Sequence, residues 1–172
     1  MSLLNVTNDY VFKRIFGQKK NSDILKDLLQ AILTDIEITS VHVNQDVSLE
    51  RQLMTDKLGI LDIVATLNNG TRVNIEMQVK DYNNTVDRSV FYESGLLHES
   101  LNKNEDYLQI PKSIGIWILN YDIFNNGSFH EIARLRRDHE NIVLTDKFEI
   151  HYIQLPKFKQ KCKRISNKLE EW

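Results

Sequence analysis

A short turn signal between two β-rich runs is the feature that most constrains how this chain can fold. Residues 59–67 and 71–80 are rich in apolar and β-branched side chains, and Asn68, Asn69 and Gly70 stand between them. Asn and Gly tolerate the left-handed backbone conformations that tight hairpin turns need. The segment therefore predicts two antiparallel strands joined by a hairpin.

Burial of apolar side chains decides the register of this hairpin. A two-residue loop would mix apolar and charged side chains on one face and place Ile63 opposite Glu76. A three-residue loop, with Gly70 in the left-handed conformation of a bulged turn, places Ile63 opposite Ile75 and separates an apolar face from a polar one. The three-residue loop is therefore predicted, and it makes Asp62 the direct cross-strand neighbour of Glu76.

Two carboxylates in direct cross-strand contact destabilise a sheet unless their charge is compensated. A divalent cation held between Asp62 and Glu76 is one compensation, and a shared proton is another. Ordinary solvation on the polar face is a third alternative, although Asp62 has an apolar neighbour on each side along that face. Gln78 and Lys80 follow Glu76 on the same face, because side chains of a strand alternate.

Further strands and helices are predicted around this hairpin. Apolar residues at helical spacing predict helices over residues 7–17, 21–33 and 85–102. The continuous apolar run 114–119 predicts a central strand that is covered on both faces. The predicted fold class is α/β or α+β. The sequence predicts a central mixed sheet flanked by helices, in one domain of residues 1–172. Alternating stretches predict three more strands, over residues 36–47, 129–135 and 148–155.

Composition excludes several classes of protein. The chain has 22 basic and 24 acidic side chains and a net charge of -2, which excludes the uniform positive charge of a histone-like protein but not a local basic patch. The apolar runs are strand-sized and the N-terminus lacks a signal-peptide pattern, so no membrane partner is expected. A single cysteine excludes an intrachain disulfide and fits a cytoplasmic location.

An Asp followed, a hairpin's length later, by Glu-x-Gln stands in the block from Asp62 to Gln78. This block and several other segments, in order along the chain, resemble the bacterial PD-(D/E)XK nuclease family transposases, also described as recombination-promoting nucleases. The block is the most specific part of the resemblance, which covers nearly the whole chain. The other matching segments are residues 8–17, 56–63, 73–78, 88–92, 107, 114–119 and 149–157.

The resemblance implies a restriction-endonuclease-like core with its active site at the hairpin. It implies that Asp62, Glu76 and the backbone carbonyl of Met77 bind Mg²⁺ or Mn²⁺, and that the substrate is DNA. The implied activity is metal-dependent endonucleolytic cleavage linked to DNA recombination. Chains of the family generally continue into a helical tail, so this chain is expected to be short at its C-terminal end.

Gln78 stands where the superfamily most often has Lys, and the resemblance gives it the role of orienting water. An amide cannot act as a general base, so lowering the pKa of the water is left to the metal. Lys80 and Lys13 are candidates for the missing positive charge. Asp9 either complements the helix dipole and pairs with Lys13, or is delivered toward the metal by the first helix. Arg88 lies either near the scissile phosphate or over an aromatic ring.

A basic run near the C-terminus predicts either contact with DNA phosphates or a solvated helix end. Metal-dependent DNA endonuclease is the favoured function. The alternatives are a catalytically degenerate module of the same fold that binds nucleic acid or protein, and an interaction module whose hairpin acids are only surface groups. A homodimer is left open. The basic run consists of Lys157, Lys159, Lys161, Lys163, Arg164 and Lys168.

Overall fold

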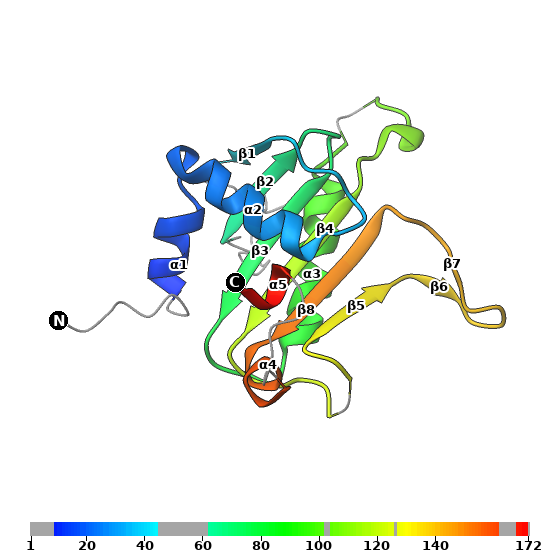
Figure 1. Cartoon of the computed structure of the whole chain (residues 1–172). Coiled ribbons are helices and arrows are strands. Elements are labelled where there is room, and N and C mark those ends of the chain that lie inside the picture. The colour runs from blue at the N-terminus through cyan, green and yellow to red at the C-terminus, as the bar shows by residue number, and fades with distance from the viewer. Residues whose placement is uncertain (1–8, 45–61, 102–103, 126, 162–167, 172) are drawn as a thin grey trace, which may run out of the picture.

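The structure is a computed structural model with one central sheet between two layers of helices (Figure 1). It describes residues 9–44, 62–101, 104–125, 127–161 and 168–171. The first two residues of the predicted helix 7–17, part of the predicted strand 36–47 and part of the basic run lie outside the described residues. The predicted fold class, a mixed sheet with flanking helices, is confirmed.

Six strands form the central sheet. They are β1 (Val41–Asn44), β2 (Ile63–Leu67), β3 (Arg72–Gln78), β4 (Ser113–Leu119), β5 (His130–Arg134) and β8 (Phe148–Gln154). Their order across the sheet is β1-β2-β3-β4-β8-β5. Antiparallel pairing joins β1, β2 and β3, parallel pairing joins β3, β4 and β8, and β5 is antiparallel to β8. The sheet is therefore mixed, with its parallel strands in the centre.

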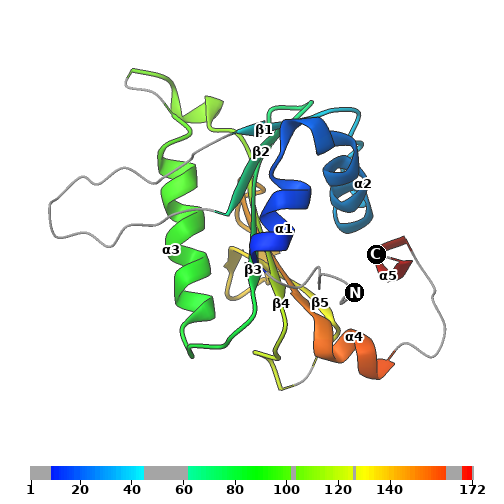
Figure 2. The ribbon, with the colours of Figure 1, turned by 90° about the vertical axis from the view of Figure 1, so that its left-hand side faces the viewer.

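Helices cover both faces of this sheet (Figure 2). The helix between β3 and β4, α3, lies against one face, and it supplies the crossover that two parallel neighbours require. Two N-terminal helices, α1 and α2, lie against the other face. In the described part of the chain, no helix is long and apolar enough to cross a membrane. The helices are α1 (Asp9–Phe16), α2 (Ser22–Ile32), α3 (Thr85–His98), α4 (Leu155–Lys161) and α5 (Lys168–Glu171), with 3-10 turns η1 (Lys19–Asn21) and η2 (Tyr107–Gln109).

Alternation along β4 divides the core between the two faces. Ile114, Ile116 and Ile118 join the apolar cluster that packs against α1 and α2. Trp117 and Leu119 join the cluster on the α3 side. Every residue of β4 is buried, so the prediction of a central strand covered on both faces is confirmed.

The predicted hairpin register is also confirmed. Ile63 pairs with Ile75, and the ladder continues to Thr66 opposite Arg72. Gly70 has φ +83°, the left-handed conformation expected for the third loop residue. The apolar face of this hairpin packs against α1 and α2, but the face predicted to be polar is covered by α3.

The predicted strand 36–47 is shorter in its described part, where β1 spans only Val41–Asn44. The amide of Gln30 explains the difference. Its nitrogen donates to the carbonyl of Ile36 at 2.9 Å, and its oxygen accepts from the N–H of Ile38 at 2.9 Å. These backbone groups bond to a side chain of α2, so they are not available to a strand ladder.

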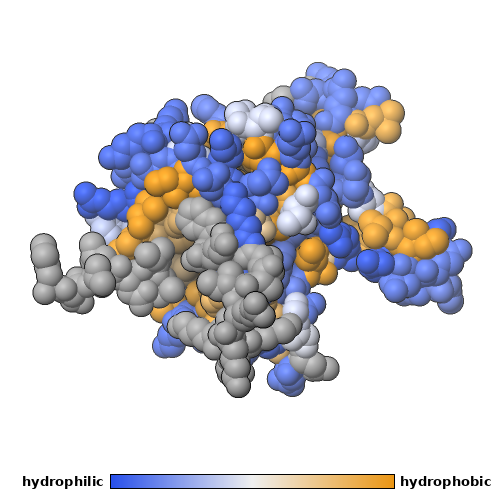
Figure 3. All heavy atoms as spheres, viewed as in Figure 1, coloured by the Kyte–Doolittle hydropathy of each residue, from blue (hydrophilic) through white to orange (hydrophobic). Residues whose placement is uncertain are grey.

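Two further differences lie at the edges of the molecule. The helix predicted to reach residue 102 ends at His98. A second, two-stranded sheet of β6 (Arg136–Arg137) and β7 (Ile142–Val143) was not predicted, because each strand has only two residues. This hairpin projects from the body of the molecule and exposes aliphatic side chains (Figure 3).

Candidate active site

The two hairpin acids are in direct contact. Asp62 stands immediately before β2, and its backbone N–H donates to Oε1 of Glu76 at 3.0 Å. In return, the backbone N–H of Met77 donates to Oδ2 of Asp62 at 3.2 Å. Each carboxylate therefore bonds to the backbone of the opposite strand, and the predicted neighbours Asp62 and Glu76 are brought together.

Burial dominates the electrostatics of Glu76, which is 1% exposed beneath α3. Loss of solvent raises the pKa of Glu76 to about 8, and the negative charge of Asp62 adds to the rise. The backbone N–H of Asp62 and the charge of Arg88 act in the opposite direction. Ordinary solvation, one of the three compensations left open by the sequence, is therefore wrong for Glu76.

A lysine from α1 compensates the charge of Asp62. Nζ of Lys13 lies 2.7 Å from Oδ1 of Asp62, whose side chain is 10% exposed. Phe12 and Phe16 anchor α1 in the core, and Lys13 between them reaches the hairpin. Of the two lysines predicted to supply positive charge, Lys13 is at the acids. Asp9 begins α1, but its side chain lies outside the described part of the chain.

Gln78 and Arg88 extend the site along β3 toward α3. Nε2 of Gln78 lies 3.4 Å from Oε2 of Glu76, and Nη1 of Arg88 donates to Oε1 of Gln78 at 3.1 Å. The guanidinium also lies over two rings, 5.2 Å from the centroid of Tyr92 and 5.7 Å from that of Trp117. Arg88 is thus packed over aromatic rings, as one prediction had it, while it holds Gln78 beside Glu76.

The remaining predicted residues lie elsewhere. Lys80 is exposed, with Nζ 5.3 Å from the ring centroid of Tyr82. Lys157 donates a hydrogen bond to the carbonyl of Phe124, so this lysine of the basic run bonds to the protein itself. Lys168 is exposed on α5. Lys163 and Arg164, and the side chains of Lys159 and Lys161, lie outside the described residues.

A buried acid of α3, Glu93, was missed by the sequence reasoning. It accepts a hydrogen bond from the hydroxyl of Ser113, and burial raises the pKa of Glu93 to about 7. A Cβ on Gly115 would lie 2.7 Å from Oε2 of Glu93, so the carboxylate would have to move if a residue with a Cβ stood there. That glycine, inside an otherwise apolar strand, is the signal of a close approach that could have indicated a buried partner.

The donor set at the hairpin suits a hard divalent cation. Carboxylate and carbonyl oxygens from Asp62, Glu76 and Met77 are the ligand type that Mg²⁺ and Mn²⁺ prefer. Among the residues that the structure describes, no group of three or more His, Cys, Asp or Glu side chains could hold a metal. Two carboxylates are nevertheless sufficient for Mg²⁺, which usually keeps several waters and takes one or two carboxylates from the protein.

The mixed six-stranded sheet with helices on both faces is consistent with a PD-(D/E)XK nuclease-like fold. A family model described as PD-(D/E)XK nuclease family transposase matches residues 6–172, and the chain belongs to this family. The resemblance drawn from the sequence is thereby confirmed. No curated protein and no solved structure was found to match. The family supports a nuclease or transposase-like role with DNA as the substrate, and PD-(D/E)XK nucleases generally use divalent metals.

Proposed function

We propose that this protein is a metal-dependent DNA endonuclease that acts in DNA recombination. The observation that carries the proposal is the contact between Asp62 and Glu76, with Gln78 beside Glu76 on the same strand. Asp62, Glu76 and the carbonyl of Met77 would hold Mg²⁺ or Mn²⁺. When bound, the ion would lower the pKa of a water molecule and stabilise negative charge on the phosphate.

The side chains around these acids have complementary roles in the proposal. The amide of Gln78 is fixed by Arg88 and orients the attacking water through its remaining hydrogen-bonding capacity. Arg88 and Lys13 place positive charge on either side of the carboxylates, where it favours an approaching phosphodiester. Asp62 holds the N–H of Met77 and so fixes the backbone that carries the third proposed oxygen ligand.

A second candidate, a degenerate member that binds DNA or protein without cleaving, is favoured by a specific observation. Lys13 already forms a 2.7 Å ion pair with Asp62, and an amide stands at position 78. Because a lysine neutralises one of the proposed metal ligands, the charge of Asp62 is compensated without a metal ion. The two candidates differ in whether added metal displaces this pair.

Plasmid nicking tests the proposal. Supercoiled plasmid is incubated with the protein in Mg²⁺, in Mn²⁺ and in chelator, and the conversion to open circles is measured. We expect metal-dependent nicking by the wild type, loss of nicking in Glu76→Gln, and wild-type activity in Glu37→Gln, whose side chain is exposed between α2 and β1. Nicking by Glu76→Gln at the wild-type rate would contradict the proposed site.

DNA binding separates the remaining outcomes. Fluorescence anisotropy of a labelled duplex measures binding in the same buffers. Binding without nicking in either metal would favour the degenerate module. Absence of binding, together with an unchanged melting temperature in millimolar Mg²⁺ and Mn²⁺, would favour the interaction module, since an ion that binds the native state raises its stability.

A further inference from the structure

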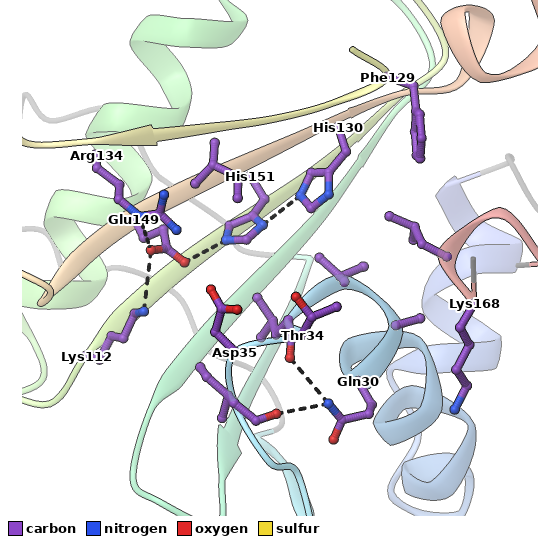
Figure 4. Close-up of a pocket in the computed structure, with 16 residues that line it drawn as sticks. Gln30, Thr34, Asp35, Lys112, Phe129, His130, Arg134, Glu149, His151 and Lys168 are labelled. Carbon is purple, nitrogen blue, oxygen red and sulfur yellow. Dashed lines mark hydrogen bonds and ion pairs between the residues drawn. The ribbon is translucent and has the colours of Figure 1, made fainter. Parts of the chain in front are cut away.

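A pocket of about 580 Å³ opens on the face of the sheet that carries α2 (Figure 4). It lies between α2, β5, β8 and α5. One part of its wall is apolar and includes Ile36, Phe129, Ile132 and Leu169. The volume is in the range of small-molecule sites, and the mixed wall is typical of them. Its charged and imidazole residues are Asp35, Lys112, His130, Arg134, Glu149, His151 and Lys168.

The strand register separates this pocket from the proposed nuclease site. Glu76 is level with Trp117 and Tyr152, whose side chains belong to the cluster on the α3 side. His151 is level with Ile116, which belongs to the cluster on the opposite face. Because side chains alternate along a strand, the pocket residues of β8 and the hairpin acids lie on opposite faces of one sheet.

A chain of three titratable side chains runs along the pocket wall. Oε1 of Glu149 lies 2.7 Å from Nε2 of His151, and Nδ1 of His151 lies 2.8 Å from Nε2 of His130 (Figure 4). Burial alone would raise the pKa of Glu149, but hydrogen bonds from His151 and Arg134 hold it at about 2. Burial and the neighbouring His151 lower the pKa of His130 to about 4. At neutral pH, Glu149 is therefore a carboxylate and His130 is uncharged.

Hydrogen-bond direction along this chain depends on one proton. A carboxylate only accepts, so Nε2 of His151 donates to Glu149. With His151 neutral, its Nδ1 accepts from His130, and Nδ1 of His130 is left as an acceptor. With His151 protonated, its Nδ1 donates to His130, and the proton of neutral His130 moves to Nδ1. Uptake of one proton by the chain thus changes Nδ1 of His130 from an acceptor into a donor.

Nδ1 is the atom of His130 that a ligand can reach. Among the described residues, the only hydrogen bond of the His130 ring is the one from Nε2 to His151. His130 itself lines the pocket and is only partly buried. A donor at Nδ1 favours an anionic ligand, whereas an acceptor there opposes one.

Two cations beside this chain offer further donors to an anion. Arg134 contacts Glu149 through Nε at 2.7 Å, which leaves its two terminal nitrogens as a planar fork, the geometry that pairs with a carboxylate. Lys112 also contacts Glu149, at 3.4 Å. The lining holds three cations against two carboxylates, so one positive charge is in excess. That balance suits a single negative charge.

We propose that this pocket binds a small organic monoanion, a carboxylate attached to an apolar body, and that the Glu149–His151–His130 chain couples binding to the uptake of one proton. Arg134 pairs with the carboxylate, Nδ1 of His130 donates to it, and the apolar wall takes the body of the ligand. The charges of Glu131 on β5 and Glu149 on β8 act on His130 directly. The other charged groups that line the same pocket are Asp35 after α2, Lys112 before β4, Arg134 on β5 and Lys168 on α5.

Calorimetric titration with benzoate tests the proposal, with acetate and benzamide as matched probes. Benzoate carries the charge and the ring, acetate lacks the ring, and benzamide lacks the charge. We expect benzoate to bind wild type at least about tenfold more tightly than either analogue. We also expect its affinity to fall several-fold from about pH 6 to about pH 8, because a complex that takes up a proton as it forms is favoured where protons are more abundant. All titrations are made in chelator, so they do not depend on nuclease activity.

Substitutions show which residues are responsible for benzoate binding and for its pH dependence. Arg134→Gln should weaken benzoate binding about tenfold or more, while Arg137→Gln, an exposed arginine on β6 that pairs with Glu140, should leave it unchanged. His130→Asn keeps a polar side chain but breaks the chain, so its benzoate affinity should no longer depend on pH. This variant and the wild-type pH profile serve as tests if Arg134→Gln does not fold. Equal binding of benzoate and benzamide, or a wild-type affinity that is the same at both pH values, would overturn the proposal.

Discussion

Replacing Glu93 by glutamine should make the stability of this protein less sensitive to pH. The side chain projects from α3 and is fully buried against the sheet, and burial raises its pKa from an ordinary 4.5 to about 7. A raised carboxyl pKa means that the folded chain holds the proton longer than the unfolded chain. The contribution of Glu93 to the free energy of unfolding is therefore fully present below about pH 4.5, and it is lost as the pH rises through about 7.

The size of the effect follows from the shift. A pKa change from 4.5 to about 7 corresponds to about 3 kcal/mol between the two protonation states. Glu93→Gln keeps the shape and can still accept the hydrogen bond from Ser113, but it has no charge to bury. The unfolding free energy of the variant relative to wild type should therefore rise by about 3 kcal/mol between pH 4.5 and pH 8.

Urea unfolding, followed by circular dichroism in chelator at several pH values, measures this difference. Any constant cost of the new amide cancels, because only the change with pH is compared. Glu37→Gln, at an exposed position, is the matched control and should follow the wild-type curve. If Glu93→Gln and wild type lose stability in parallel as the pH rises, Glu93 is not an acid held protonated by burial.

Three other substitutions test the same structure. Gly115→Ala should lower the unfolding free energy by about 1–3 kcal/mol in urea melts, because its Cβ would lie 2.7 Å from Oε2 of Glu93; an unchanged stability would mean that the carboxylate is not packed there. Glu149→Gln should lower the free energy of unfolding by about 2 kcal/mol at pH 7. The loss should shrink as the pH falls toward about 2, the lowered pKa at which the wild-type carboxylate takes up a proton. A loss that does not change with pH in urea melts would contradict this. Asp62→Asn should melt close to wild type in chelator, because the loss of the ion pair with Lys13 is offset by removal of the negative charge that acts on Glu76. The rise in melting temperature that Mg²⁺ induces should vanish in this variant. A rise as large as that of the wild type would refute Asp62 as a metal ligand.

The hairpin could be predicted from sequence because burial leaves one register. Only the three-residue loop gathers Ile63 and Ile75 on one apolar face, and the structure has that pairing. The contact of Asp62 with Glu76 follows from the same register, since both residues belong to one local unit. β4 was predictable for a similar reason, because a run of apolar residues must be covered on both faces.

Contacts between distant segments could not be predicted in this way. Lys13 reaches Asp62 from a helix far back in the chain, and Arg88 reaches Gln78 from the crossover helix. The sequence indicated both residues as candidates but left their partners open. Glu149 and His151 are two residues apart on one strand, whereas His130 joins them only because β5 pairs with β8. No local pattern fixes that pairing.

Alternation along the strands keeps the two proposed sites chemically independent. Glu76 and Gln78 point to the side of α3, while Glu149 and His151 point to the side of α2, and the buried strand β4 separates β3 from β8. Every residue of β4 is buried, so no solvent path crosses the sheet there. A substitution in the pocket can therefore change anion binding and its pH dependence without altering the charge at the hairpin acids. The same separation means that failure of one proposal in its own assay leaves the physical basis of the other unchanged.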